Sequence, residues 1–306
     1  MIKIENLVKT FGAKRAVDDI SFTVERGEVL GFLGPNGAGK STTMRMITGF
    51  MPPTAGKVSV GGHDIVDSPL EAKRLIGYLP ENAASYPDMT VHGFLNFAAE
   101  LRGLEGSARK KAVHHVVDLC FLESVLYQSI DTLSKGYKHR TCLAQALIHD
   151  PQVLIMDEPT DGLDPNQKHE VRNLIRNLGA SKAIIFSTHI LEEVDAACSR
   201  AIIIDRGRIV ANGTPQELRG MSELAGAVTL AAVGASEEKL RELGRVERLN
   251  GAFRIYPADK ARASELAQAV VELVKRERWK VEGMYSERGE LDEVFRRITL
   301  PDTVKK

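Results

Sequence analysis

The sequence predicts an α/β fold, with a first domain built on a mainly parallel sheet and a smaller α+β domain after it. Short apolar runs alternate with stretches of helical periodicity along most of the chain, a pattern typical of strands covered by helices. A glycine-rich loop at residues 34–42 joins one of these runs to a helix. Near the C-terminus, Asn250-Gly251 separates two strand-like runs and predicts a hairpin. A length of 306 residues accommodates about two such domains.

The opening part of the chain predicts short strands. The turn-forming pairs Pro52-Pro53 and Gly61-Gly62 separate some of the strand-like runs. After the second pair, Ser68-Pro69-Leu70-Glu71 has the form of a capping box with proline at the first helical position, which predicts a short helix. The predicted strands cover residues 2–8, 20–24, 28–33, 57–60 and 77–79, with a helix over residues 40–48.

Residues 90–134 then take on helical periodicity, and a further helix is predicted over residues 138–149. The apolar runs 153–156, 183–187 and 201–205 predict buried strands. Asp164 is placed to cap a helix that reaches about residue 178, and another helix starts near residue 191. We expect a first domain over residues 1–219, with a helical subdomain at about residues 90–150.

The remaining residues, 220–306, predict a small accessory domain. Strands are expected at 227–233, 245–249, 252–256 and 280–285, with helices at 237–243 and 260–277. This βαββαβ order is the ferredoxin-like arrangement. A last helix is expected at 291–298. A regulatory or dimer-stabilising role and a merely covering role are both open for this domain.

The composition excludes some functional classes. Lys plus Arg and Asp plus Glu both number 41, so no basic field predicts nucleic-acid binding and no acidic excess predicts disorder. The three cysteines lack metal-binding spacing and are expected to be buried in a reducing compartment. We expect no signal segment at the N-terminus, and no apolar run of the given sequence approaches the ~20 residues of a membrane helix. Any membrane work is therefore expected to go through another subunit.

The loop at residues 34–42 matches the Walker A pattern, with Gly34 followed after four residues by Gly39-Lys40-Ser41. Its glycines let backbone N–H groups turn toward phosphate oxygens. Lys40 is expected on the β- and γ-phosphates and Ser41 on Mg²⁺, with the helix N-terminus adding positive dipole. The alternative is a plain glycine-rich turn. The predicted contacts of this loop are Gly34, Pro35, Asn36, Gly37, Ala38, Gly39, Lys40, Ser41 and Thr42.

Two adjacent carboxylates, Asp157 and Glu158, follow the apolar run 153–156. The carboxyl end of a buried strand is where a doubly wound sheet keeps its ligand crevice. We expect Asp157 to hold Mg²⁺ through water and Glu158 to polarise an attacking water as general base. The alternative is a pair of solvated acids at a strand end.

Five motifs in order resemble those of the ATP-binding subunit of an ABC transporter. The resemblance covers roughly residues 1–218. Its motifs are the phosphate loop, Leu133-Ser134-Lys135-Gly136-Tyr137, the strand ending in Asp157-Glu158, Gly162-Leu163-Asp164-Pro165 and Ser187-Thr188-His189.

The resemblance implies a head-to-tail dimer that encloses two ATP molecules with Mg²⁺. Ser134 and Gly136 of one subunit would face the γ-phosphate held by the other, and Asp164 would bridge the dimer near the catalytic water. His189 would contact the γ-phosphate and orient that water. Phe11 resembles the aromatic residue that stacks on adenine, although a core phenylalanine is the alternative.

The chain departs from the family pattern at a few positions. Glu81 stands where glutamine is usual; it can still ligate Mg²⁺ but adds negative charge beside the triphosphate. Lys135 and Tyr137 replace the more common glycine and glutamine, and Asp161 replaces a small residue. Each of these departures bears on the turnover rate.

Three features most resemble export-type subunits, which pair with a separate ABC-2 permease: Leu79-Pro80-Glu81, the single ATP-binding half and the closing motif at residues 290–295. We therefore expect an ATPase that energises export by dimer closure, as a homodimer or heterodimer. It would lie in the cytoplasm at the inner face of the membrane, held there by the permease. The alternative function is a soluble ABC ATPase acting on nucleic acid or ribosomes, although no nucleic-acid partner is expected from the neutral charge.

Overall fold

The structure is a computed structural model that describes residues 1–82, 85–259 and 263–299. It divides into two compact units, Met1–Asn212 and Gly213–Lys306. The division lies a few residues before the expected boundary at 219, because the helix at residues 215–220 groups with the second unit. Each unit is described below by itself.

Two sheets form the first unit. One is the expected, largely parallel sheet, in the order β10-β9-β3-β8-β7-β6. Neighbours from β9 to β6 all pair in parallel. Its strands are β3 (Val29–Leu33), β6 (Ile76–Leu79), β7 (Val153–Asp157), β8 (Ala183–Thr188), β9 (Arg200–Asp205) and β10 (Arg208–Gly213).

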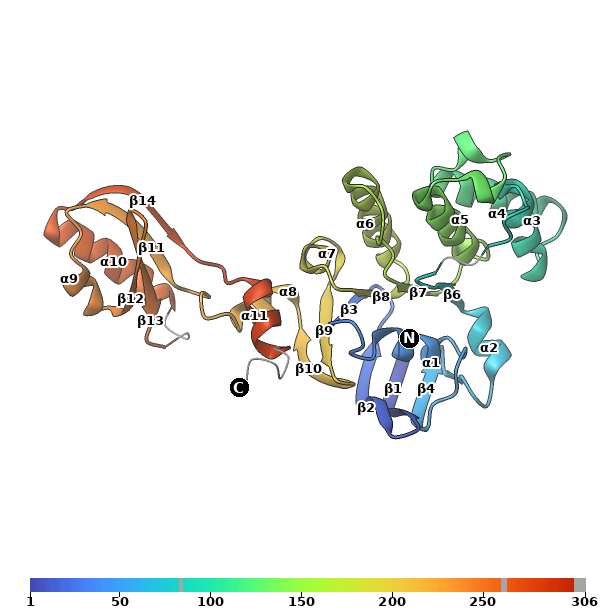
Figure 1. Ribbon diagram of the computed structural model, residues 1–306, viewed down its shortest axis with the longest axis horizontal. Coiled ribbons are helices and arrows are strands. Elements are labelled where there is room, and N and C mark those ends of the chain that lie inside the picture. The colour runs from blue at the N-terminus through green and yellow to red at the C-terminus, as the bar shows by residue number, and fades with distance from the viewer. Residues whose placement is uncertain (83–84, 260–262, 300–306) are drawn as a thin grey trace. The chain divides into compact units, whose positions relative to one another are not determined.

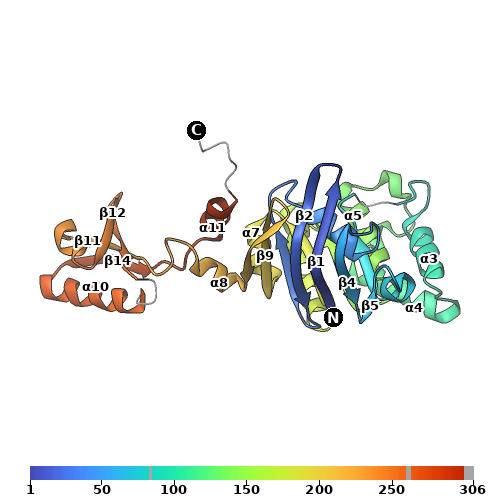
Figure 2. The same ribbon diagram turned by 90° about the horizontal axis from the view of Figure 1, so that it is seen from below.

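The second sheet corrects the fold prediction, which did not foresee it. Its order is β2-β1-β4-β5, with antiparallel pairing throughout, and its long strands lie side by side in Figure 2. Its first two strands are longer than the predicted runs 2–8 and 20–24, and they pair with irregular register near Asn6 and Asp19, which adopt positive φ. The strands are β1 (Ile2–Phe11), β2 (Lys14–Val24), β4 (Ala55–Val60) and β5 (His63–Asp64).

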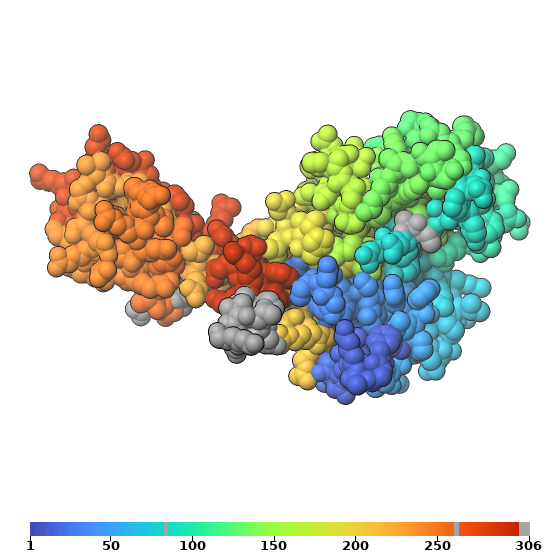
Figure 3. All heavy atoms as spheres, in the orientation of Figure 1, coloured from blue at the N-terminus to red at the C-terminus, as the bar shows by residue number. Residues whose placement is uncertain are grey.

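The helices of the first unit cover these sheets (Figure 1). In the space-filling view, the teal and green atoms of α3 to α5 gather in one lobe of the unit (Figure 3). Short 3₁₀ turns, Glu123–Val125 and Ile130–Thr132, precede α5. The helices are α1 (Lys40–Ile47), α2 (Pro69–Arg74), α3 (Val91–Leu101), α4 (Gly106–Leu119), α5 (Lys135–Leu147), α6 (Pro165–Gly179) and α7 (Leu191–Ala197).

Two helix starts differ from the prediction. Ser68 precedes α2 but its side chain accepts no capping hydrogen bond, so the predicted capping box is wrong. The backbone of Ser68 adopts φ −131° and ψ 58°, outside the extended conformation that aims a cap side chain at the first turn. Helix α5 begins at Lys135 rather than at residue 138, because Ser134 is its N-cap and accepts a bond from the Tyr137 N–H.

The central strands are buried on both faces, and this arrangement fixes the position of their ends. Along β7, Val153 and Ile155 belong to the core beneath β1, β2 and α1. Leu154 and Met156 belong instead to the core formed with α3 to α6. Alternate side chains of a strand point to opposite faces, so burial of both faces fixes the register of the strand. The carboxylates that follow β7 are thereby held at the carboxyl edge of the sheet.

The second unit is built on an antiparallel sheet in the order β12-β13-β11-β14. Its core gathers residues such as Val228, Leu230, Ile255 and Val270, with Trp279 packed against it. Lys260, the expected start of the long helix, lies outside the described residues, and the helix is described from Ala263. The elements are α8 (Pro215–Gly220), β11 (Val228–Val233), α9 (Glu237–Arg241), β12 (Gly244–Leu249), β13 (Ala252–Pro257), α10 (Ala263–Glu277), β14 (Lys280–Ser286) and α11 (Leu291–Ile298).

Candidate ATP site

The loop between β3 and α1 is shaped by its glycines. Gly37 and Gly39 adopt φ of 82° and 112°, which L side chains rarely adopt. A Cβ on Gly39 would lie 2.6 Å from the carbonyl oxygen of Ala16, and one on Gly34 would lie 2.4 Å from that of Ile204. The loop therefore depends on glycine for close backbone approach as well as for conformation.

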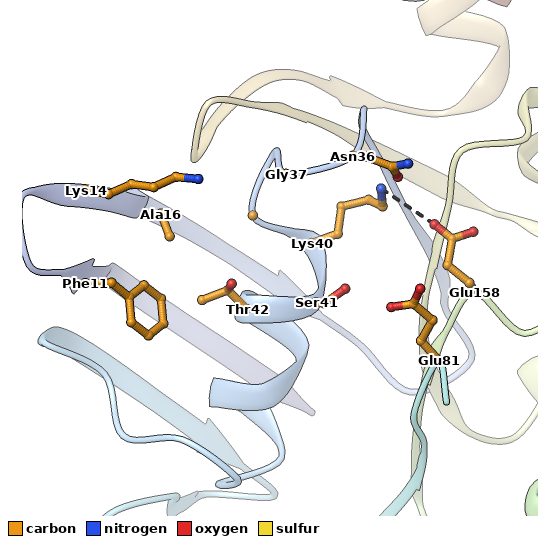
Figure 4. Close-up of a pocket in the computed structure, with 11 residues that line it drawn as sticks. Phe11, Lys14, Ala16, Asn36, Gly37, Lys40, Ser41, Thr42, Glu81 and Glu158 are labelled. Atoms are coloured by element: carbon orange, nitrogen blue, oxygen red, sulfur yellow. Dashed lines mark ion pairs between the residues drawn. The ribbon is translucent and has the colours of Figure 1, made fainter. Parts of the chain in front are cut away.

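This loop lines a cavity of about 420 Å³. Figure 4 shows Phe11 on one side, near Thr42, and the carboxylates of Glu81 and Glu158 on the other, facing Ser41 and Lys40. The lining residues are Phe11, Lys14, Ala16, Asn36, Gly37, Gly39, Lys40, Ser41, Thr42, Glu81 and Glu158. The cavity thus brings together most of the predicted nucleotide contacts.

Lys40 is the buried cation of this cavity. Its side chain is 6% exposed, and Nζ donates to the carbonyl oxygen of Gly34 at 2.8 Å. The same Nζ lies 3.6 Å from Oε1 of Glu158. A buried charge needs partners of this kind, and a phosphate would be a stronger one. The residue is therefore preset to receive an anion at the N-terminus of α1.

Phe11 lies at the surface of the cavity, with 47% of its area exposed. Nζ of Lys9 lies 5.3 Å from the centre of its ring. The exposed ring does not belong to the core, which was the alternative reading of its sequence position.

Glu158 is held in an unusual backbone conformation, with φ of 52°. Its N–H donates to Oγ of Ser187 at 2.9 Å, and the Ser187 hydroxyl donates to Oδ1 of Asp157 at 2.5 Å. Asp157 is therefore buried behind the cavity, while Glu158 turns into it. Nδ1 of His189 lies 2.9 Å from Oε2 of Glu158. The two predicted catalytic residues are in direct contact.

A buried carboxylate supports the loops that carry this pair. Glu193, in the first turn of α7, is 1% exposed and accepts hydrogen bonds from the hydroxyls of Thr160 and Thr188. Thr160 follows Glu158 by two residues, and Thr188 precedes His189. Sequence reasoning missed Glu193 and Ser187, as well as Lys14 and Ala16 in the cavity lining. The two threonines beside known motifs were the only signal for Glu193.

The remaining predicted contacts do not line the cavity. Ser134 is an exposed N-cap at the start of α5, and Gly136 lies in its first turn against the side chain of Gln167. Asp164 caps α6, where Oδ1 accepts the Gln167 N–H at 3.0 Å. The serine and the aspartate are thus exposed at two helix N-termini. Gly34, Ala38 and Asp157 are buried, and the carbonyl oxygen of Pro35 accepts a hydrogen bond from Nζ of Lys40 at 3.4 Å.

The donor set fits a hard divalent cation that takes much of its coordination from elsewhere. Ser41 and Glu81 present oxygen atoms to the cavity. Within the described residues, no group of three or more His, Cys, Asp or Glu side chains could form a protein-only cage. Mg²⁺ bound between a protein and phosphates needs only one or two protein oxygens.

Comparisons with known proteins agree with this geometry. The family model described as ABC transporter matches residues 17–161. The chain is 38% identical to the linearmycin resistance ATP-binding protein LnrL of Bacillus subtilis, over 82% of this chain and 81% of that protein. It is also 38% identical to Nod factor export ATP-binding protein I of Ralstonia nicotianae, over 71% and 68% of the two chains.

Solved structures show the same fold. A structure described as the ATP-binding subunit of an ABC transporter aligns with a TM-score of 0.67 and 32% identity, over 72% of this chain and 92% of that one. In the part of the chain that the structure describes, no helix has both the length and the apolar character needed to cross a membrane.

Proposed function

The chain belongs to the family of ABC transporter ATP-binding subunits and is an ATPase, and from this premise we propose that it energises export through a separate ABC-2 permease. The observation that carries the proposal is the cavity in which Lys40 and Glu158 meet at the N-terminus of α1. Two relatives named for linearmycin resistance and Nod factor export support the assignment to export.

ATP binds in this cavity with its phosphates on the α1 loop. Lys40 exchanges its contact with Glu158 for the β- and γ-phosphates, and the loop N–H groups receive the phosphate oxygens. Phe11 presents an exposed ring for stacking against adenine. Lys14 lines the same cavity and adds a second cation near the loop.

The hydroxyl of Ser41 and the carboxylate of Glu81 would hold Mg²⁺, with Asp157 contributing through a water molecule. When bound, the ion neutralises phosphate charge during transfer. The hydrogen bond from the Ser187 hydroxyl to Oδ1 fixes the orientation of the Asp157 carboxylate. Asp157 is 1% exposed, and neutralisation by a nearby cation would offset the cost of burying its charge.

Glu158 acts as the base that polarises the attacking water, and His189 orients it. Their 2.9 Å contact fixes the Glu158 carboxylate while leaving its other oxygen toward Lys40. Release of Lys40 to phosphate would free that oxygen to accept a proton from water. Binding of the nucleotide and activation of the base are therefore linked through one lysine.

Hydrolysis requires a second protomer, because Ser134, Gly136 and Asp164 lie away from the cavity of their own chain. The α5 N-terminus offers a serine hydroxyl and backbone N–H groups that would face the γ-phosphate of a partner, in a homodimer or a heterodimer. Asp164 would stand beside that interface. Closure of the dimer around ATP then drives the permease.

We assign the ATP-binding domain to the first unit, with residues 90–150 as its helical subdomain, in place of the range 1–219 read from the sequence. The second unit is proposed as a ferredoxin-like accessory domain. Its strand order, β12-β13-β11-β14, with the first and third strands central, supports this assignment. Attachment through the permease would place the protein at the inner face of the membrane.

The test is the variant Glu158→Gln, which keeps the shape of the side chain but removes the base. With excess Mg-ATP it should form a dimer by light scattering, while ATP turnover falls by about 10²- to 10⁴-fold. A variant that stays monomeric would contradict the shared site. Full ATP turnover by the variant would show that Glu158 is not the base. Binding of the wild-type protein to RNA or DNA with steep salt dependence would favour the alternative function instead.

A further inference from the structure

Two residues that depart from the family pattern contact each other. Nζ of Lys135, at the start of α5, lies 2.9 Å from Oδ2 of Asp161, in the loop before α6. The family commonly has glycine at the first position and a small residue at the second. Neither departure is explained by the nucleotide cavity, because neither residue lines it.

The lysine also packs along the loop that it reaches. Gly162 has φ of 68°, and a Cβ there would lie 2.3 Å from Nζ, 2.6 Å from Cε and 2.7 Å from Cδ of Lys135. The outer part of the side chain, from Cδ to Nζ, therefore lies against Gly162. It fills the space that a Cβ at this position would occupy.

A second contact joins the same two segments. A Cβ on Gly136 would lie 2.4 Å from Oε1 of Gln167, so the first turn of α5 packs against the first turn of α6. Asp164, the N-cap of α6, is bonded to the Gln167 N–H. The α5 N-terminus and the residues from Asp161 to Gln167 thus form one joined surface.

Electrostatics at Asp161 agree with the contact. The hydrogen bond from Lys135 lowers the pKa of Asp161, with smaller contributions from the charges of Lys135, His189 and Lys168. The pair is more than half exposed, 65% for Lys135 and 53% for Asp161. An exposed ion pair contributes little to the stability of a fold, so stability does not account for it.

We propose that Lys135 and Asp161 are positioning residues, which tie the partner-facing N-terminus of α5 to the loop that follows Glu158. The inference rests on the proposed function, in which α5 faces the nucleotide of the other protomer. The loop from Asp161 to Asp164 follows Glu158, which faces the nucleotide bound by the same protomer. A structural change at that nucleotide is therefore transmitted through the ion pair to α5, and from α5 to the nucleotide of the other protomer.

The ion pair thus couples the two nucleotide sites of the dimer, at positions where the family commonly has glycine and a small residue. Lys135 stays with Asp161 rather than transferring to the phosphate. If Lys135 instead bound the nucleotide directly, exchanging the charges of Lys135 and Asp161 would not restore turnover.

The experiment compares four variants of the full chain: Lys135→Gly, Asp161→Ala, the two combined, and the exchanged pair Lys135→Asp with Asp161→Lys. Each is assayed for ATP turnover against ATP concentration, and for ATP binding to the monomer. Each single variant should lower kcat about fivefold or more, with monomer binding unchanged. The combined variant should be no worse than the singles, since both act through one contact. The exchanged pair should restore kcat to within about twofold of the wild type.

The matched control is another exposed ion pair, Lys3 with Glu5 on β1, whose atoms lie 2.8 Å apart. Lys3→Ala should leave kcat unchanged. Thermal unfolding of every variant should lie close to that of the wild type, because exposed pairs contribute little to stability.

Three results would overturn the proposal. An exchanged pair as slow as Lys135→Gly, with Asp161→Ala near wild type, would place Lys135 on the phosphate itself. Wild-type kcat in both single variants would leave the pair without a role, even where Glu158→Gln dimerises. Failure of Glu158→Gln to dimerise with Mg-ATP would remove the proposed function, and the coupling inference with it.

Discussion

Two helix N-termini of the first unit carry phosphate-binding features, and their surroundings differ. The N-terminus of α1 lies in a cavity with a buried cation, Lys40, and with carboxylates opposite. The N-terminus of α5 carries an exposed serine, Ser134, and lines no part of that cavity. Both have the hydrogen-bond donors and the dipole that attract an anion. Only the first is enclosed by its own chain.

The difference separates binding from turnover. Under the proposed function, a nucleotide held at α1 would meet a cation, metal-binding oxygens and a base within one protomer. The α5 surface would need a second protomer to supply its phosphate. Changes at α1 should therefore affect binding, and changes at α5 should affect turnover alone.

The largest effect is expected at α1 from Lys40→Ala. This variant removes the buried cation of the cavity, so ATP turnover should fall by about 10²- to 10³-fold and binding should weaken. Calorimetry of ATP binding to the monomer measures the second effect. Unchanged affinity would break the assignment of binding to α1.

The next effect is expected at α5 from Gly136→Asp, which adds a negative charge to the first turn of α5, near the N-terminus that the partner's phosphate would approach. Turnover should fall about tenfold or more, because like charges are brought together, while ATP binding to the monomer stays within about twofold. Gly136→Ala serves as the control for bulk, since the side chain of Gln167 can move. If Gly136→Asp abolished ATP binding to the monomer, the assignment of binding to α1 and turnover to α5 would be contradicted.

A smaller effect is expected from Glu81→Gln, which restores the residue usual in the family. The Mg²⁺ concentration for half-maximal turnover should rise, by about tenfold or less, because an amide is a weaker ligand than a carboxylate. Titration of Mg²⁺ at fixed ATP measures this. A lowered requirement would show that Glu81 acts through repulsion of the phosphates instead.

The smallest effect concerns acid stability of α5. Burial lowers the pKa of His139 to about 4, against an ordinary value of 6.5, so the folded state holds it neutral. The unfolded chain takes up its proton first as the pH falls from about 6.5 to about 4, and the free energy of unfolding decreases over that range. His139→Gln should flatten this decrease by about 1–3 kcal/mol, as measured by urea unfolding at several pH values. An equal slope in both proteins would place the acid sensitivity elsewhere, for example at buried His149, whose pKa is also lowered to about 4.

The sequence predicted the family and the main α/β sheet, and both are confirmed. Fixed spacing explains this success, since Gly34, Lys40 and Ser41 must meet one ligand whatever surrounds them. Strands such as β7 and β8, which are buried on both faces, are also easy to predict because they form continuous apolar runs. The roles of the site residues stay predictions, and Figure 4 shows where several of these residues lie around the cavity.

The antiparallel sheet and the contacts between distant segments were not predictable in the same way. Strand β2 begins at Lys14, six residues before the predicted start, and its polar residues Lys14, Arg15 and Asp18 resemble a loop. Pairing with β1 stabilises them as a strand, which is a tertiary effect. Lys135 and Asp161 were each noticed as departures, but their 26-residue separation gave no sign that they meet.

The left-handed backbone at Glu158 has an evolutionary consequence. A residue with a side chain beyond Cβ pays for that conformation, whereas glycine or asparagine adopts it readily. If Glu158 has the proposed role, mutation to either residue would relax the main chain and remove the base in one step. A duplicated copy of this gene with such a mutation would encode a more stable subunit that does not hydrolyse ATP at its own site but still contributes α5 to the site of its partner. A homodimer could in this way evolve into a heterodimer.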